Sequence, residues 1–287
     1  MLPIAGVGLA RIEFIIANSI GIHPLALLHF DDITDESIKK EIQEKTIMYA
    51  QKDEFYVDQL AQGIAVIAAA FYPRPVVVRF SDFNTNEYKC LIGGAQFEPE
   101  EENPMLGFRG ASRYYHAFFK EAFSLECLAM VRVCSQMGLD NIIPMVPFVR
   151  TVAEAEHVLQ EISSYQLKTV EKNIPIYMMC EIPSNVILID QFSDHFDGFS
   201  IGSNDLTQLV LGVDRDSALI SSIFNENDEA VKKMICLAIE GAKKKGKKIS
   251  ICGQAPSDYP AFMQFLIDQG IDGVSLNPDA ILNLFVV

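Results

Sequence analysis

Seven short apolar runs, each followed by a turn and then by a helical pattern, predict an α/β fold with a parallel sheet. Continuous apolar character is typical of strands buried on both faces. Seven such units in 287 residues point to a (β/α)8 TIM-type barrel or to an open doubly wound sheet. Because seven is one short of a closed barrel and the first run begins almost at once, we expect one TIM-type barrel domain over residues 1–287 that lacks its first strand and helix. The expected strands are Gly6–Leu9, Val76–Phe80, Ile142–Phe148, Ile176–Cys180, Gly198–Ile201, Ile249–Cys252 and Gly273–Leu276.

Apolar stripes at helical spacing indicate the helices between these strands. One stripe runs through residues 57–71 in steps of three and four, which places its members on one face of a helix. Thr151 and Glu154 have the spacing of a capping box at the start of another helix. A third stripe runs through residues 119–134 and includes two cysteines, which we expect to fill core volume.

Composition restricts the partners and the location. The chain has 38 Asp and Glu against 23 Lys and Arg, a net charge of −15, and this surplus argues against binding nucleic acid. With 49% hydrophobic residues the chain can bury a sizeable core. Neither a membrane span nor a signal peptide is predicted, so we expect a cytoplasmic location. The six cysteines are scattered without CxxC pairs, which predicts reduced thiols instead of a zinc site or disulfides.

Charged or reactive side chains end several of the expected strands. In a TIM-type barrel, catalytic residues lie at the carboxyl ends of the strands and on the loops that follow. Reading those ends in chain order gives Arg11, Arg79, Glu181, Asn204 with Asp205, and Cys252.

Three arginines are candidate ligands for an anion. Arg11 and Arg79 end strands, and Arg109 lies in the glycine-rich segment Gly107–Gly110. The planar guanidinium group binds carboxylate or phosphate oxygens bidentately and stays charged when partly buried. Together these arginines would give a −15 protein the local positive charge that an anionic substrate needs. The simpler interpretation is that each arginine pairs with a neighbouring acid.

Two carboxylates are candidate metal ligands. Glu181 ends one expected strand and Asp205 follows the next, so the two could share Mg²⁺, which prefers oxygen ligands. The alternative is structural: Asp205 could cap the N-terminus of a helix that starts near Leu206.

Cys252 differs from the other cysteines by its position. Strand alternation puts Ile249 and Ile251 on one face, under the helices, and Ser250 and Cys252 on the other, toward the barrel interior. A thiol at the mouth of the barrel could exchange protons with a carbon acid at neutral pH. The alternative role of a lone cysteine is packing.

One long segment has little periodicity. Loops as long as Ser81–Ser112 are usually functional or disordered, and the end at Asn103–Gly110 could close over the barrel mouth. The basic run Lys243–Lys248, in contrast, is typical of a solvated helix C-terminus.

Six segments together resemble a known family. They closely resemble the C-terminal domain of the phosphoenolpyruvate (PEP) synthases, of the PEP-utilising enzyme family, and the likeness runs essentially from end to end. The pyruvate phosphate dikinases and enzyme I of the sugar phosphotransferase system share this domain type, but residues 79–83 look like the synthase version. The segments are Gly6–Phe14, Val78–Phe83, Asn103–Gly110, Glu181–Asn185, Gly202–Gln208 and Ile251–Gln254.

The resemblance implies an activity and a role for each site residue. Members of this family convert ATP, pyruvate and water to PEP, AMP and phosphate through a phosphohistidine on a separate, swivelling domain. By motif, the three arginines would bind carboxylate and phosphoryl oxygens. Glu181 and Asp205 would hold Mg²⁺, Ser203 and Asn204 would contact the phosphoryl group, and Cys252 would move the proton at the methyl carbon.

The resemblance also implies partners. No ATP-binding module and no phosphorylatable histidine of the family type are recognisable, so we expect a truncated or separately expressed pyruvate/PEP-binding domain that acts with those domains. A homodimer is expected as well. Two alternatives stay open: an enzyme I-type phosphotransferase domain, or a catalytically silent fragment that binds ligand or mediates dimerisation.

Overall fold

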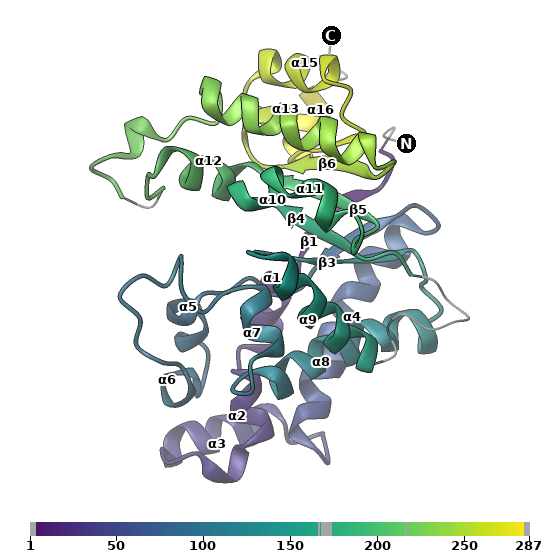
Figure 1. The fold of residues 1–287 in the computed structure, drawn as a ribbon. Coiled ribbons are helices and arrows are strands. Elements are labelled where there is room, and N and C mark those ends of the chain that lie inside the picture. Colours follow the sequence, from purple (N-terminus) through teal and green to yellow (C-terminus); the bar gives the residue numbers. More distant parts are fainter. Residues whose placement is uncertain (1–3, 166, 168–173, 216, 284–287) are drawn as a thin grey trace. The chain divides into compact units, whose positions relative to one another are not determined.

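The computed structural model describes residues 4–165, 167, 174–215 and 217–283, and it contains all seven expected strands (Figure 1). They follow one another in the sheet in chain order, without the reversal that defines a doubly wound fold. This order, with parallel pairing and intervening helices, is that of a TIM-type barrel, so the predicted fold class is confirmed. The strands are β1 Val7–Arg11, β2 Val76–Arg79, β3 Ile142–Val146, β4 Tyr177–Cys180, β5 Gly198–Gly202, β6 Lys248–Cys252 and β7 Gly273–Ser275.

The chain forms two compact units, which are described separately. The first comprises Met1–Gly6, Ala10–Pro147 and Glu156–Ile174, and the second comprises Val7–Leu9, Phe148–Ala155 and Pro175–Val287. The expectation of a single domain stays a prediction.

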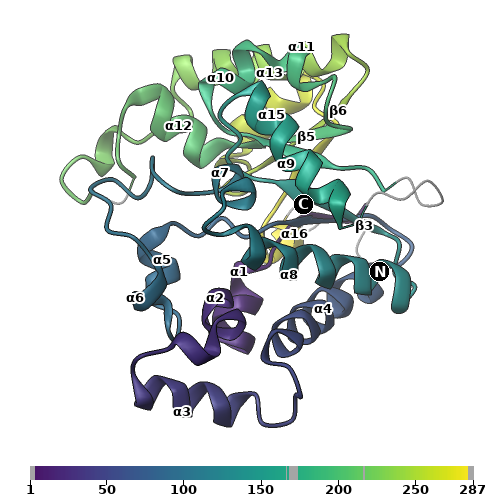
Figure 2. The same cartoon turned by 60° about the horizontal axis from the view of Figure 1, so that its bottom comes forward.

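In the first unit, β2 and β3 pair in parallel from Val76 opposite Ile142 to Arg79 opposite Met145. Helices α4 and α8 pack together beside them (Figures 1 and 2). The stripe through residues 119–134 is completely buried, so its two cysteines do fill core volume as expected. The helical elements are α1 Glu13–Ile15, η1 Ile16–Ile20, α2 Pro24–Leu28, η2 Phe30–Asp32, α3 Glu36–Lys45, α4 Lys52–Phe71, α5 Thr85–Lys89, α6 Gly94–Phe97, α7 Ala111–Tyr115, α8 Lys120–Val131 and η3 Arg132–Gln136; α9, Val152–Ser164, has its first turn in the second unit.

The segment expected to lack periodicity contains α5 and α6. A capping box starts α5: Asn84 Oδ1 accepts the backbone N–H of Glu87 at 3.0 Å, and Glu87 Oε2 accepts that of Asn84 at 2.9 Å. Farther along, the side chain of Glu98 is completely buried with those of Arg113 and His23. The segment is therefore anchored by side chains, and closure of its Asn103–Gly110 end over the barrel mouth stays a prediction.

The second unit contains three parallel strand pairs, β4 with β5, β5 with β6 and β6 with β7. Gly8 in β1 leaves no room for a side chain, because a Cβ there would overlap Ser275 Oγ in β7. The first and last strands of the sheet are therefore neighbours at this point, as in a barrel. The basic run Lys243–Lys248 begins at the C-terminus of α13, as predicted, but its last residue, Lys248, begins β6. The helical elements are α10 Pro183–Ile187, α11 Ile189–Phe192, α12 Ser203–Leu211, η4 Ser221–Ile223, α13 Glu229–Lys244, α14 Ala255–Asp258, α15 Pro260–Asp268 and α16 Pro278–Asn283.

All six cysteines are free thiols, in agreement with the sequence. Among the helices of the described residues, none combines the length and the apolar character needed to cross a bilayer.

Candidate active site

The end of β2, in the first unit, brings two of the three predicted arginines onto one carboxylate. Arg109 donates from Nε to Asp82 Oδ1 at 2.9 Å and from Nη2 to Asp82 Oδ2 at 2.8 Å. Arg79, the last residue of β2, has Nη1 at 3.3 Å from the same Oδ2. The side chains of Arg109 and Asp82 are 4% and 3% exposed. Asp82 therefore holds two guanidinium groups close together, an arrangement suited to binding an anion.

A second acid completes this cluster. Glu13 Oε1 accepts Nη2 of Arg79 at 2.6 Å and the backbone N–H of Asp82 at 2.7 Å. The simpler interpretation of the arginines, pairing with acids, thus holds for Arg79 and Arg109. Arg11 ends β1 two residues before Glu13 and is exposed.

In the second unit, Glu181 follows β4 and is almost completely buried, at 1% exposure. Its Oε1 accepts the backbone N–H of Phe148 at 2.8 Å. The turn that carries Glu181 is held by Asn185, whose Oδ1 accepts the backbone N–H groups of Glu181 and Ile182 at 3.2 and 2.9 Å. Gly202 lies against this carboxylate, because a Cβ on Gly202 would overlap Glu181 Oε2. Local backbone geometry therefore sets the position of Glu181.

Asp205 occupies the first turn of α12, but it is not the N-cap. The helix begins at Ser203 with Gly202 as N-cap, so the expectation of a helix that starts near Leu206 was wrong. Gly202 has φ −87° and ψ 84°, outside the helical region, and the helical backbone begins at the next residue, directly after β5. Asp205 Oδ2 lies 3.7 Å from Nη1 of Arg215, a residue that the sequence analysis did not single out.

Ser203 and Asn204 lie between Gly202 and Asp205 at the start of α12. Ser203 is fully buried, and its Oγ donates to Oε1 of Glu226. Oε2 of Glu226 accepts the backbone N–H of Ala255 at 3.1 Å. Glu226, whose pKa is raised by burial, thus connects the turn after β5 to the turn after β6. Glu226 could not be recognised from the sequence, because it precedes α13 in a segment without a strand-end motif.

Cys252 ends β6 and is 6% exposed. Its Sγ accepts the Ser200 hydroxyl at 3.3 Å and donates to the Ile201 carbonyl oxygen at 3.6 Å. Sδ of Met179 lies 4.0 Å away. Ile249 and Ile251, on the other side of the strand, are completely buried. Because Cys252 is buried as well, the assignment of the two faces of β6 stays a prediction.

The second unit supplies a donor set that suits a hard cation. Glu181 and Asp205 carry the carboxylate oxygens, and the lack of a side chain on Gly202 is what allows this residue to lie against Glu181 Oε2. Mg²⁺ usually takes one or two carboxylates and keeps waters and substrate oxygens as its other ligands. The described residues include no group of three or more His, Cys, Asp or Glu side chains placed to hold a metal ion. The pair is thus compatible with Mg²⁺ coordinated mainly by water and substrate.

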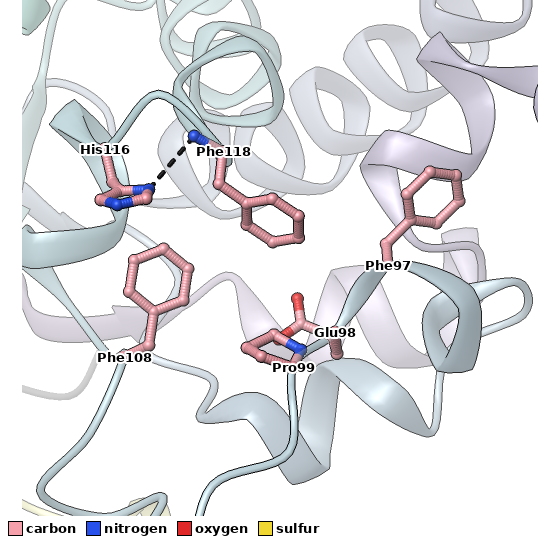
Figure 3. A pocket seen from close by; sticks show the side chains of 6 residues that line it. All are labelled: Phe97, Glu98, Pro99, Phe108, His116 and Phe118. Carbon is pink, nitrogen blue, oxygen red and sulfur yellow. Dashed lines mark hydrogen bonds between the residues drawn. The ribbon is translucent and has the colours of Figure 1, made fainter.

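A cavity of about 470 Å³ lies elsewhere in the first unit (Figure 3). His116 and Phe118 on its wall are joined by a hydrogen bond from the Phe118 backbone N–H to His116 Nδ1 at 3.1 Å. None of the predicted catalytic, substrate-binding or metal-binding residues lines it, although Phe108 belongs to the Asn103–Gly110 segment, and its wall is mostly aromatic. The lining residues are Phe97, Glu98, Pro99, Phe108, His116 and Phe118.

Residues 1–284 match the family model described as the PEP-binding domain of PEP-utilising enzymes. The chain belongs to this family. PEP synthases from Synechocystis, Deinococcus radiodurans and Escherichia coli are 60%, 57% and 53% identical to it over 98–99% of the chain. The chain spans only 34–36% of the length of these relatives. Haloferax volcanii malate synthase shares the fold, with a TM-score of 0.51 at 12% identity over 80% of this chain and 59% of that one.

Proposed function

We propose that this PEP-binding domain is the pyruvate/PEP-binding catalytic domain of a PEP synthase. The observation that carries the proposal is the set of residues at the ends of the strands: arginines at the ends of β1 and β2, carboxylates after β4 and β5, and a thiol at the end of β6. TIM-type barrels bind their substrates at this end of the strands. The similarity to PEP synthases over nearly the whole chain supports the same function and favours it over an enzyme I-type domain.

On this proposal the first unit binds the anionic groups of the substrate. Arg79 and Arg109 recognise carboxylate and phosphoryl oxygens with Arg11, and Asp82 keeps their guanidinium planes in place. Guanidinium groups suit this task because they offer paired donors and do not lose their charge. The exposed Arg11 is the member best able to change its orientation when ligand arrives.

The second unit contributes the chemistry at the carbon atoms. Cys252 removes or returns a proton at the methyl carbon of pyruvate. Ser203 and Asn204 contact the phosphoryl group. Glu181 and Asp205 are the residues that would hold Mg²⁺, which when bound supplies positive charge for the developing enolate. Because the Ser203 hydroxyl donates to Glu226, Ser203 can contact the phosphoryl group only if its hydroxyl group interacts with both.

The complete reaction, from ATP, pyruvate and water to PEP, AMP and phosphate, needs the ATP-binding and phosphohistidine domains as partners. The enolate oxygen of pyruvate would attack the phosphorus atom of the phosphohistidine, which the phosphohistidine domain carries. The chain's coverage of about a third of its relatives fits such an arrangement. The proposal also includes a homodimer in the cytoplasm, and light scattering on the purified chain would measure its mass.

Calorimetric titration with PEP in the presence of Mg²⁺ tests the proposal. We expect saturable heat from the wild-type chain and its loss in Arg79→Met, which keeps an apolar stem but removes the charge. Arg74→Met is the matched control, because Arg74 donates to the carbonyl oxygen of Ile4 and lies outside the site. Absence of binding heat in the wild-type chain would instead favour a catalytically silent domain.

A further inference from the structure

Ser81 lies between the two residues that organise the arginines, Arg79 and Asp82, and buried side chains hold all three of its polar groups. Its backbone N–H donates to Glu126 Oε2 at 3.0 Å, and its hydroxyl also bonds to Glu126 Oε1. Its carbonyl oxygen accepts the Tyr114 hydroxyl at 2.6 Å. These partners come from α7 and α8, so the turn after β2 is tied to two helices that carry no arginine of the site.

The hydroxyl of Ser81 belongs to a chain of hydrogen bonds. Tyr88 Oη, from α5, lies 2.6 Å from Ser81 Oγ. With Glu126 as carboxylate, Tyr88 donates to Ser81 and Ser81 donates to Glu126, and every hydrogen has an acceptor. With a proton on Glu126 Oε1, both bonds reverse, and the Tyr88 hydrogen then has no hydrogen-bond acceptor recorded among the described residues. Because Tyr88 is completely buried, the carboxylate form satisfies this chain better.

We propose that Glu126, as a carboxylate, is a positioning residue for Arg79 and Arg109, which it does not contact. Glu126 fixes Ser81, Ser81 fixes the start of Asp82, and Asp82 orients both guanidinium groups. The inference rests on the proposed function, in which these two arginines bind the substrate. Charge-assisted hydrogen bonds are about twice as strong as neutral ones. Protonation of Glu126 therefore weakens its hold on Ser81, and with it the positioning of Asp82 and of the two guanidinium groups.

Several elements of the first unit influence this carboxyl group. The pKa of Glu126 is raised to about 7, chiefly by burial: the charge of Glu13 on α1 also raises it, whereas the Ser81 hydrogen bonds and Arg113 on α7 lower it. The phenols that interact with it electrostatically are Tyr56 on α4, Tyr88 on α5 and Tyr114 on α7, and Cys127 is its neighbour on α8. The carboxylate form therefore predominates above pH 7 and is lost as the pH falls below 7.

The first test follows the NMR signal of the Arg109 side chain as a function of pH, without any ligand. The Arg109 Nε–H bond to Asp82 can be followed by its ¹H–¹⁵N resonance between pH 5.5 and 8.5. We expect a transition with a midpoint near pH 7 that is absent from Glu126→Gln, a variant of the same shape that cannot ionise. Glu121→Gln, an exposed position on the same helix, should titrate like the wild type. A wild-type Arg109 resonance without a transition near pH 7 overturns the inference, whether or not the variant folds.

The second test measures the affinity for pyruvate in the presence of Mg²⁺ at pH 6 and pH 8. Pyruvate suits the purpose because its carboxylate stays ionised over this range. We expect the wild type to bind about five to ten times more weakly at pH 6, and Glu126→Gln at pH 8 to resemble the wild type at pH 6. Equal affinity of variant and wild type at pH 8 overturns the inference. A normal Arg109 transition with no pyruvate binding at any pH contradicts the proposed function but not the positioning by Glu126.

Discussion

The end of β2 in the first unit and the ends of β4 to β6 in the second hold their functional side chains in different ways. Arg79 and Arg109 are held by the carboxylates of Asp82 and Glu13. Glu181 and Cys252 are held mainly by backbone and hydroxyl groups of neighbouring turns and strands. The first region should therefore respond to loss of single charges and to pH, and the second to changes of backbone or side-chain volume.

The largest effect should follow removal of the shared acid. Asp82→Ala leaves Arg109 buried without its bidentate partner, which costs about 3–5 kcal/mol when a buried ion pair is broken. The free energy of unfolding from urea denaturation measures this loss. Asp194→Ala is the control, because the exposed Asp194–Lys245 pair, with 3.2 Å between Oδ1 and Nζ, should be worth less than about 1 kcal/mol. Equal losses in both variants would contradict the account of the first region.

The next effect concerns pH. The pKa of Glu126 is about 7 in the folded chain against an ordinary value of 4.5, so the folded state binds the extra proton between these values. Stability contributed through this group is therefore lost as the pH rises from 5 toward 8, by about 2–3 kcal/mol. Glu126→Gln lacks this loss, so its free energy of unfolding relative to wild type should rise with pH. Parallel pH curves for the two proteins would show that Glu126 does not titrate near pH 7.

The smallest of the three effects should come from added volume in the second region. Gly202→Ala places a methyl group against Glu181 and Met179, and overpacking of this kind costs about 1–3 kcal/mol. We also expect it to weaken Mg²⁺ binding by displacing Glu181. Gly273→Ala is the matched control in β7, because its Cβ would lie at an ordinary 3.5 Å from Ser250 Cβ. Titration calorimetry with Mg²⁺ and pyruvate measures the affinity for Mg²⁺. An unchanged affinity in Gly202→Ala would contradict the role of Glu181 as a metal ligand.

The sequence predicted the strands and the types of side chain at their ends because both depend on local patterns. Apolar runs located all seven strands to within two residues at each end. The start of α12 was misplaced because Asp205 is a good capping residue by type, whereas the helix begins two residues earlier, after an N-cap at Gly202 that has no side chain to signal it.

The partners of those side chains could not be predicted, because most are distant in sequence. Glu13 is 66 residues from Arg79, and Asp82 is 27 residues from Arg109. Glu126 did leave a signal: it follows Phe123 by three positions and precedes Met130 by four, so a charged residue lies in phase with an apolar stripe. A glutamate in that position either faces a buried partner or interrupts the core, and here it binds Ser81.

The central claim, that this domain enolises pyruvate through Cys252, is tested most directly by proton exchange. Pyruvate in heavy water with Mg²⁺ and the wild-type chain should lose its methyl proton signal in NMR spectra. Cys252→Ala should slow this exchange at least about 100-fold, the usual contribution of a general base. The exposed Cys90→Ala should exchange like the wild type. Exchange at the wild-type rate in Cys252→Ala would contradict the role of Cys252.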